Sequence, residues 1–551
     1  MTTDLQQPGG HRRLSAGDLS TSAPGGHRDG GPAAPGLLRT QRTLPLSRRW
    51  HALVCWLLAA TTALLVACGG GDLTTAGGVG SGGTGLAEGT VTGLGSVIVD
   101  GITYTETNAA VVADNESGQP GNADLQLGQR VRLVYGQING ADTASRIEVL
   151  PQLKGPVTAV ASAAGQLQVM GQTVQVQSTG TQSQTVLAGV ASVSALAVGD
   201  VVEVHGSWQR DAATARYQLV ATRLEKIAAT AAATDSIRLL SGVVHGLSST
   251  SAGMVWHLNA ADGVAVLTTS ASAPAGLANG SLVRVWLTTA ALASQPLPAL
   301  RTVLADLATA ATATGTNSTN DGDIRFSAQV ASYSATTRKL EVQGVTLSLP
   351  SGLVLDEDAL GKGGYVTVSL SRKGGQLQVV NASAQAGGTA LSREIELKGV
   401  LSGIDFSISQ VVFDMRGTTV QAARSVLDAD CLLAGTGDVY LQVEGRMPAG
   451  STTLQASRVQ CKAQAPNADA VVEREGTVLS VNTAQRSLVL QLGTGAKSTT
   501  LTAVWDTNSY FQQSPDKLPG LTVEIEGVQN GSQLRIRRVR LITGAKGASD
   551  D

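Results

Sequence analysis

The sequence has few aromatic and few charged side chains. Only 3% of its 551 residues are aromatic and 15% are charged, and the formal net charge is −2. Without a net positive charge, the chain has no broad field that attracts a polyanion. With so few rings, it also offers few platforms on which nucleic-acid bases stack. We therefore expect no nucleic-acid partner.

The residue types that build metal and catalytic sites are also scarce, with 6 histidines and 4 cysteines. His205, His245 and His257 show no HxH or HExxH spacing, and the chain has no CxxC pair and no GxSxG nucleophile elbow. These absences predict no metal site, no cofactor and no catalytic residues.

Glycine and small apolar residues are abundant instead, and they recur in a pattern. The 65 glycines suit short β-strands joined by tight turns. A strand that opens with a small residue recurs along the chain, as in "EGTV" from Glu88, "KGPV" from Lys154, "SGVV" from Ser241, "SAQV" from Ser327, "KGVL" from Lys398 and "EGTV" from Glu475. A second pattern alternates around a glycine, as in "LQVMGQTVQV" from Leu167, and predicts a hairpin with one buried face.

A third pattern returns after a variable loop in each unit. It reads "LGQRVRLVYG" from Leu127, "VGDVVEVHG" from Val198, "NGSLVRVWL" from Asn279, "GKGGYVTVSL" from Gly361, "GTGDVYLQVEG" from Gly435 and "LPGLTVEIEG" from Leu518. Because side chains alternate between the two faces of a strand, we expect the valines and leucines to face inward and the arginines, glutamates and threonines to face water.

These patterns predict an all-β chain built as a tandem array of small repeats. The predicted repeats are residues 87–150, 153–227, 238–308, 324–385, 394–464 and 471–543, followed by a tail at 544–551. Four or five strands in roughly 70 residues suit a small closed barrel of the OB type. A unit of this size buries only about 60% of its unfolded surface, which makes it marginally stable alone.

The order of these motifs resembles the DUF5666 family of bacterial envelope proteins. The shared features are the glycine-opened strand, the V-x-G hairpin, the L-x-x-G-x-x-V-x-V-x-G segment and a closing A-[ST]-x-[IL] strand. The resemblance is strongest in the first, second and last repeats and weakest in the third and fourth. It implies an OB-like β-barrel, several copies of which often follow a lipidation signal. The family's function is uncharacterised, so the resemblance predicts fold rather than ligand.

The N-terminal region predicts export. Residues 1–47 are rich in Gly, Pro, Ser, Thr and Arg and are expected to be disordered, or an over-extended gene start. Residues 48–67 combine two arginines with an apolar run of about 15 residues, which is short for a membrane span of roughly 20 and suits a signal peptide. The alternative is an uncleaved anchor helix.

The apolar run ends in Leu65-Val66-Ala67-Cys68, which resembles the lipobox of bacterial lipoproteins. The resemblance implies cleavage before Cys68, acylation of Cys68 and a membrane anchor, with residues 68–86 as a Gly-rich tether. Gly69 at the next position implies the outer membrane. In the alternative reading, Cys68 is an ordinary buried cysteine.

Two cysteines remain in the body of the chain. In an oxidising compartment, Cys431 and Cys461 would form a disulfide closing a loop of about 30 residues, with a stabilisation of roughly 3 kcal/mol. The alternative is two separate buried thiols, since the sequence does not establish proximity.

The last strand is the most basic stretch of the chain. Arg535, Arg537 and Arg540 alternate in "LRIRRVRLI" and would line one side of the terminal barrel. They are either a solvated strand face or a site for an anionic ligand such as a glycan or lipid headgroup.

Two classes of function remain open. The first is a non-enzymatic binding or scaffolding lipoprotein of the bacterial cell envelope, whose barrels meet an envelope polymer, a small ligand or another protein. The second is an envelope enzyme or enzyme accessory with a hidden site in one repeat. The missing acid, base and nucleophile patterns favour the first class.

Overall fold

The computed structural model describes residues 84–106, 109–138, 140–177, 185–211, 213–229, 237–305, 324–343, 345–357, 360, 364–373, 376–385, 391, 394–401, 403–433, 437–448, 451–462, 471–493, 498–507, 509–530 and 533–542. Strands make up nearly all of their regular secondary structure, which confirms the predicted all-β, OB-like fold class. No helix within these ranges is long and apolar enough to cross a membrane.

The strands fall into consecutive groups, numbered here from 1 to 6. Group 1 contains β1 (Gly85–Leu94), β2 (Val97–Val99), β3 (Ile102–Tyr104), β4 (Ala110–Ala113), β5 (Gly121–Asn122), β6 (Arg130–Ile138) and β7 (Ala141–Val149). Group 2 contains β8 (Leu153–Ala161), β9 (Gln166–Val169), β10 (Gln172–Val176), β11 (Val186–Ala188), β12 (Val201–Arg210) and β13 (Tyr217–Ala228). Group 3 contains β14 (Ile237–Thr250), β15 (Gly253–Leu258), β16 (Val264–Thr268), β17 (Leu282–Thr288), β18 (Leu297–Pro298) and β19 (Arg301–Leu304).

The second half of the chain continues in the same manner. Group 4 contains β20 (Ile324–Ser334), β21 (Lys339–Val342), β22 (Val345–Ser348), β23 (Tyr365–Lys373) and β24 (Gln376–Gln385). Group 5 contains β25 (Ile395–Leu401), β26 (Gln410–Met415), β27 (Thr418–Ala423), α4 (Ala429–Leu433), β28 (Val439–Arg446) and β29 (Leu454–Lys462). Group 6 contains β30 (Val471–Asn482), β31 (Ser487–Leu492), β32 (Thr499–Val504), β33 (Tyr510–Phe511), β34 (Thr522–Asn530) and β35 (Gln533–Leu541). Short 3₁₀ turns occur at Ser162–Ala164, Val193–Ala195, Ala290–Ala293, Arg424–Val426 and Pro515–Lys517.

Groups 2 and 6 close into five-stranded circuits. In group 2, β8 pairs with β9 and β12, β9 with β10, and β12 with β13, all antiparallel. A parallel pairing of β10 with β13 then completes the ring. Group 6 repeats this order with β30, β31, β32, β35 and β34, and its parallel pair is β32 with β35. Closure leaves no free sheet edge in the ring, which is the advantage of a small barrel.

The other groups vary this plan. Group 1 closes through the parallel pairs β4–β7 and Thr105–Thr143. Group 5 has the parallel pair β27–β29. Group 3 places β18 beside β16 and β19 beside β17, while in group 4 the described strands show no pairing of β22 with β24. The least regular circuits are therefore in the third and fourth groups, where the sequence pattern is also weakest.

The hydrophobic cores extend beyond single groups. One cluster contains buried residues of groups 1 and 5, and another contains those of groups 2 and 3. Smaller clusters in groups 4 and 6 reach Leu86 of β1 and Val400 of β25. Merging cores gives each small barrel buried surface that it could not supply alone.

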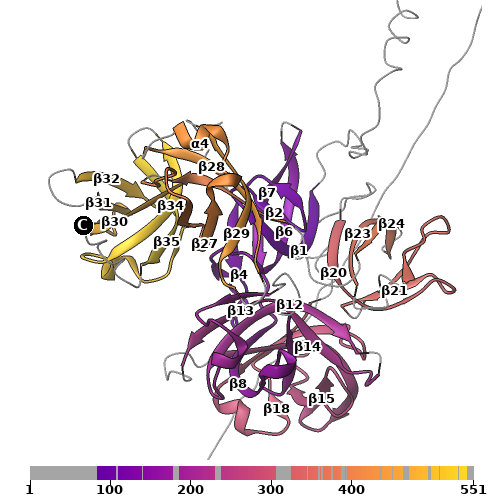
Figure 1. The fold of residues 1–551 in the computed structure, drawn as a ribbon. Helices are drawn as coiled ribbons and strands as arrows, with labels where there is room; N and C mark the ends of the chain where they lie inside the picture. Colours follow the sequence, from indigo (N-terminus) through magenta and orange to yellow (C-terminus); the bar gives the residue numbers. More distant parts are fainter. Residues whose placement is uncertain are drawn as a thin grey trace, which may run out of the picture. The chain divides into compact units, whose positions relative to one another are not determined.

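Strand β1 connects three of the groups. It pairs antiparallel with β6 in its own group, beside which it lies in Figure 1, and parallel with β20 of group 4 and β25 of group 5. All ten of its residues are buried. β1 is therefore an interior strand that three groups share, although group 1 alone has the strands of a small closed barrel.

A β-bulge explains the glycine that ends the repeated V-x-V-x-G segment. The register of the last hairpin shifts immediately before Gly206, Gly445 and Gly527. A Cβ atom at Gly206 would lie 2.1 Å from the Val220 carbonyl oxygen, and the other two glycines face a carbonyl of the opposite strand at 2.4 and 2.3 Å. Only glycine allows this close backbone approach.

We predict that Gly206→Ala destabilises the chain by about 2 kcal/mol, because the new methyl group must displace the β13 backbone. Gly136→Ala is the matched control, since it lies in the equivalent strand of group 1 with nothing within 4 Å of its Cβ position. Urea unfolding followed by far-UV circular dichroism compares the two variants. Equal midpoints would contradict the steric explanation.

Candidate functional site

The predicted export signal and anchor lie outside the described residues. The segments concerned are residues 1–47, the signal 48–67, Cys68 with most of the tether 68–86, and the tail 544–551. What the sequence predicts for them stays a prediction.

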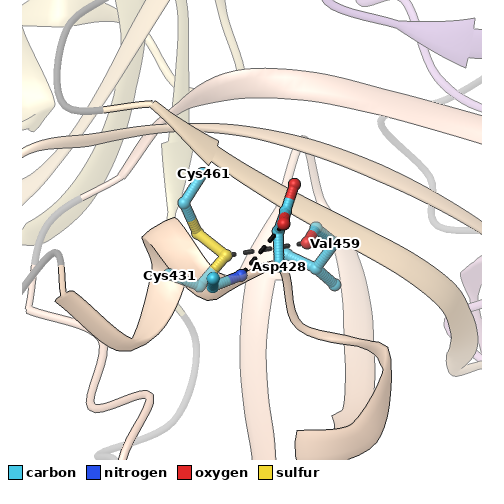
Figure 2. The surroundings of a disulfide bond; sticks show 5 residues. Asp428, Cys431, Val459 and Cys461 are labelled. Carbon is cyan, nitrogen blue, oxygen red and sulfur yellow. Dashed lines mark hydrogen bonds between the residues drawn. A yellow bond between two sulfur atoms is a disulfide. The ribbon is translucent and has the colours of Figure 1, made fainter.

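Cys431 and Cys461 are joined by a disulfide in group 5 (Figure 2). Cys431 lies on α4 and Cys461 near the end of β29, with their Cα atoms 4.8 Å apart. Both side chains are buried, and the Asp428 N–H donates a hydrogen bond to the Val459 carbonyl at 2.8 Å. The covalent bond therefore reinforces a place where the loop before α4 already contacts β29.

Two of the three histidines that follow the predicted tether lie next to each other in the structure. His245 on β14 and His257 on β15 are cross-strand neighbours, while Nε2 of His205 lies 3.1 Å from a carboxylate oxygen of Glu203. Within the described ranges, no group of three or more His, Cys, Asp or Glu side chains is arranged to hold a metal ion.

The basic last strand is not a free anionic-ligand face. Arg535 pairs with Asp506 at 2.5 Å, Arg537 with Glu106 at 3.3 Å and Arg540 with Asp124 at 2.8 Å. Arg537 and Arg540 are also only 20% and 17% exposed. Their carboxylate partners belong to group 1. Only Arg535, at 54% exposed, is on a solvated face. These arginines hold carboxylates of the same chain.

The expected outward orientation of the charged strand residues is wrong at several positions. Arg130 is 0% and Arg284 is 4% exposed, although both alternate with inward-facing apolar residues. The physical reason is that the outer faces of their strands are covered by other strand groups. The period-two pattern identifies the two faces of a strand but not what packs against each face.

One buried group of charges, the Glu473 cluster, joins groups 5 and 6. It consists of Arg416, Glu473, Glu524, Glu526 and Arg538. Arg416 pairs with Glu526 and donates its backbone N–H to Glu473 at 2.9 Å, and Arg538 pairs with Glu526 at 2.7 Å. Three carboxylates thus share two guanidinium groups within this cluster.

The unequal sharing separates the pKa values of the cluster. Burial, and then the charge of Glu524, raise the pKa of Glu473 to about 7. Burial would also raise the pKa of Glu526, but Arg416 and Arg538 outweigh it and hold that pKa below its usual value. At neutral pH, Glu473 is therefore partly protonated, while Glu526 is ionised.

A second buried group of charges, the Glu88 cluster, consists of Glu88, Arg130 and Arg132. One oxygen of Glu88 accepts from Arg130 at 2.8 Å and the other from Arg132 at 2.7 Å. Burial acts to raise the pKa of Glu88, but Arg132 and Arg130 hold it below its usual value. Arg130 also donates to the Ser327 carbonyl at 2.9 Å, which ties group 1 to group 4.

A cavity of about 160 Å³ borders the Glu88 cluster, and it is the candidate binding site. Its lining residues are Glu88, Asp114, Arg130, Arg132, Glu148, Leu150, Gln152, Leu282, Arg284, Arg301, Val303, Leu304, Ala305 and Gln343. The lining therefore contains four arginines and three carboxylates, and most of its other residues are apolar. Such a cavity suits a small anionic ligand rather than a polymer chain.

The sequence alone does not predict this site, for a specific reason. Two of its arginines lie on β6 and the other two on β17 and β19, and these three strands are far apart in the sequence or separated by loops. The one available signal was the arginine in the repeated third pattern, as in "NGSLVRVWL" and "LGQRVRLVYG", but alternation assigned it to solvent.

Comparison with known proteins assigns one strand group of this fold to a described domain family. Residues 154–225, which lie within group 2, match the family described as Domain of unknown function (DUF5666). The chain therefore contains a DUF5666 domain at this position. No curated protein matches the chain.

Two similar solved structures carry no argument about function. The "drosophila Unr CSD456" structure is 11% identical, and the match covers 41% of this chain and 98% of that chain with a TM-score of 0.13. The "Crystal structure of exotype rhamnogalacturonan lyase YesX" is 9% identical, with 84% and 82% covered and a TM-score of 0.11.

Glu473 gives the chain a predictable pH dependence. Because its folded pKa lies above the unfolded value, the folded state binds more protons between pH 4.5 and about 7, and the free energy of unfolding falls as pH rises through this range. This decrease in the free energy of unfolding should be on the order of 2 kcal/mol, and we expect Glu473→Gln to abolish it. Thermal melts at pH 5 and pH 8 measure it. The control is Glu475→Gln, two residues along the same strand and exposed; equal pH dependence in both variants would contradict the assignment.

Reduction of the disulfide is expected to lower the free energy of unfolding by about 3 kcal/mol, because the closed loop spans 30 residues of the chain. Thermal melts with and without dithiothreitol measure the effect. The double variant Cys431→Ala, Cys461→Ala should not respond to the reductant. An unmodified chain that melts identically under both conditions would argue against a stabilising role.

Proposed function

We propose that this protein is a non-enzymatic lipoprotein of the bacterial cell envelope, anchored through Cys68 in the outer membrane. Its linked barrels act as a binding or scaffolding module for an envelope polymer, a small ligand or another protein. Nucleic acid is not an expected partner, and no cofactor is required.

This proposal is supported by the ion pairs that join the strand groups. Arg301 of group 3 pairs with Asp114, Arg325 of group 4 with Asp142, and Arg540 of group 6 with Asp124. Each pair ends on a carboxylate of group 1. These pairs are partly shielded from solvent, and together they link groups 3, 4 and 6 to group 1. Linked groups suit a scaffold that holds its binding surfaces in place.

An enzyme or enzyme accessory with a site in one repeat is the second candidate. The raised pKa of Glu473 favours it, because a carboxyl that titrates near neutral pH can act as a general acid or base. Glu473 is only 6% exposed and accepts the Arg416 N–H, and it does not line the cavity described above. We therefore favour binding and scaffolding.

The anchor is tested in a bacterial host by metabolic labelling with an alkyne fatty acid and by intact mass spectrometry. The unmodified chain should carry the label and have a mature mass that starts at Cys68 plus acyl chains. Cys68→Ser should lose the label, because no thiol remains for acylation. Cys55→Ser is the matched control, since this cysteine precedes the expected cleavage site and its loss should leave labelling intact. A full-length, unlabelled mass for the unmodified chain would overturn the proposed anchor.

A further inference from the structure

The buried charges where groups 1, 5 and 6 meet form one connected network. Arg538 of the Glu473 cluster also pairs with Asp124 at 3.0 Å, and Asp124 pairs with Arg540 at 2.8 Å. Asp124 lies between β5 and β6 and therefore brings group 1 into contact with the cluster. Asp124, Arg540 and the Glu473 cluster together make up the junction network.

The junction network has one positive charge too few. It contains four carboxylates and three guanidinium groups: Asp124, Glu473, Glu524 and Glu526, with Arg416, Arg538 and Arg540. None of these side chains is more than 18% exposed. If every carboxylate were ionised, one uncompensated negative charge would be held away from water, which is costly. A single bound proton makes the network neutral.

The charged side chains around the network do not supply the missing cation. Three neighbouring cations already pair with carboxylates outside it: Lys398 with Glu396, Arg474 with Asp438 and Arg537 with Glu106. The two nearby carboxylates of Asp414 and Glu475 are exposed, so water solvates them. The charge of Asp414 acts to raise the pKa of Glu524 and thus adds to the deficit.

Glu473 is the carboxyl that holds the proton. It lies directly opposite Glu526 in the pairing of β30 with β34, where two ionised carboxylates repel each other. Both guanidinium groups of the Glu473 cluster pair with Glu526, whereas Glu473 has only the Nε of Arg416, at 3.6 Å. Burial, followed by the charge of Glu524, raises the pKa of Glu473 to about 7.

The turn between β26 and β27 lies against this carboxyl. The backbone N–H of Arg416 donates to Glu473 at 2.9 Å, and its Nε donates to the Lys398 carbonyl at 3.2 Å. Gly417, the next residue, lies so close to the Arg540 guanidinium that an added Cβ atom would clash with it. The turn therefore covers the part of the network that group 6 supplies.

This turn can move without breaking a sheet. In the described part of group 5, β27 pairs with β29 only at Val420 and Gln421, and the tip of the hairpin is paired only with itself. Met415, just before the turn, is buried in the core that groups 1 and 5 share. The movement is therefore confined to Arg416 and Gly417.

We propose that the junction network is a pH-sensitive latch. With one proton bound, the network is neutral and the β26–β27 turn lies against group 6. When the proton leaves, Arg416 and Gly417 move away from Glu473 and water reaches the carboxylates. The latch thus places a pH response at one turn, in addition to the change in global stability.

Hydrogen–deuterium exchange of the full chain, followed by mass spectrometry at pH 5 and pH 8, tests the latch. Labelling times are scaled for the pH dependence of intrinsic amide exchange. Because opening returns Glu473 to water and to its ordinary pKa, it releases a proton between pH 4.5 and about 7 and becomes more favourable as pH rises. We expect the Arg416 amide to exchange about tenfold faster or more at pH 8. Peptides of group 2, which supplies no member of the network, should show no such change.

Two variants test the charge count. Glu473→Gln removes the titrating carboxyl but keeps a carbonyl oxygen that can accept the Arg416 N–H, so the turn should stay protected at both pH values. Glu524→Gln removes one negative charge elsewhere, where the contact with Arg538 is only a 3.6 Å approach. The network is then balanced without a proton, and the pH response should disappear although Glu473 is unchanged.

Asp438→Asn is the matched control. It breaks an ion pair with Arg474 that also joins groups 5 and 6, but Asp438 is 56% exposed and lies outside the network, so the pH response should remain. If one of the two glutamine variants does not fold, the other decides. Equal scaled exchange at both pH values in the unmodified chain, a response that persists in a folded glutamine variant, or a response lost in Asp438→Asn overturns the latch.

Discussion

The burial of charged side chains on shared strands is the constraint on which the rest of the structure depends. Strand β1 is buried along its whole length, so Glu88 on it must be neutralised inside the protein. Arg130 and Arg132 do this from the neighbouring strand β6, and Arg130 then reaches group 4 through the Ser327 carbonyl. Arg130, which neutralises the buried Glu88 carboxylate, therefore also connects groups 1 and 4.

The same logic explains how units that are marginal alone form a stable body. Each strand group has the length of a small barrel, and merging its core with that of another group supplies the missing buried surface. Merging has a consequence for polar residues, because outward-facing arginines become interior. Most find carboxylates, as Arg538 does with Asp124 and Glu526. Arg284 is different, because its Nε and Nη2 donors have no hydrogen-bond partner among the described residues.

The arginines of the chain differ in what surrounds them. Arg537 and Arg540 at the end of the chain are engaged by Glu106 and Asp124, although their position in the most basic strand made them the candidates for an anionic ligand. High local charge density therefore does not by itself show that the donors of an arginine are free. Whether the Nε and Nη2 donors of an arginine are occupied depends on neighbours distant in the sequence.

The sequence by itself predicted the repeated strands and the hairpins, because alternation and turn glycines are local properties. It also predicted the all-β class and left the pairing of Cys431 with Cys461 open, since proximity is not a local property. Only the tertiary structure decided that β1 pairs with β20 and β25, that His245 faces His257, and that Arg284 lines a cavity. These depend on which barrel faces meet, and a pattern with a period of two residues carries no information about the partner of either face.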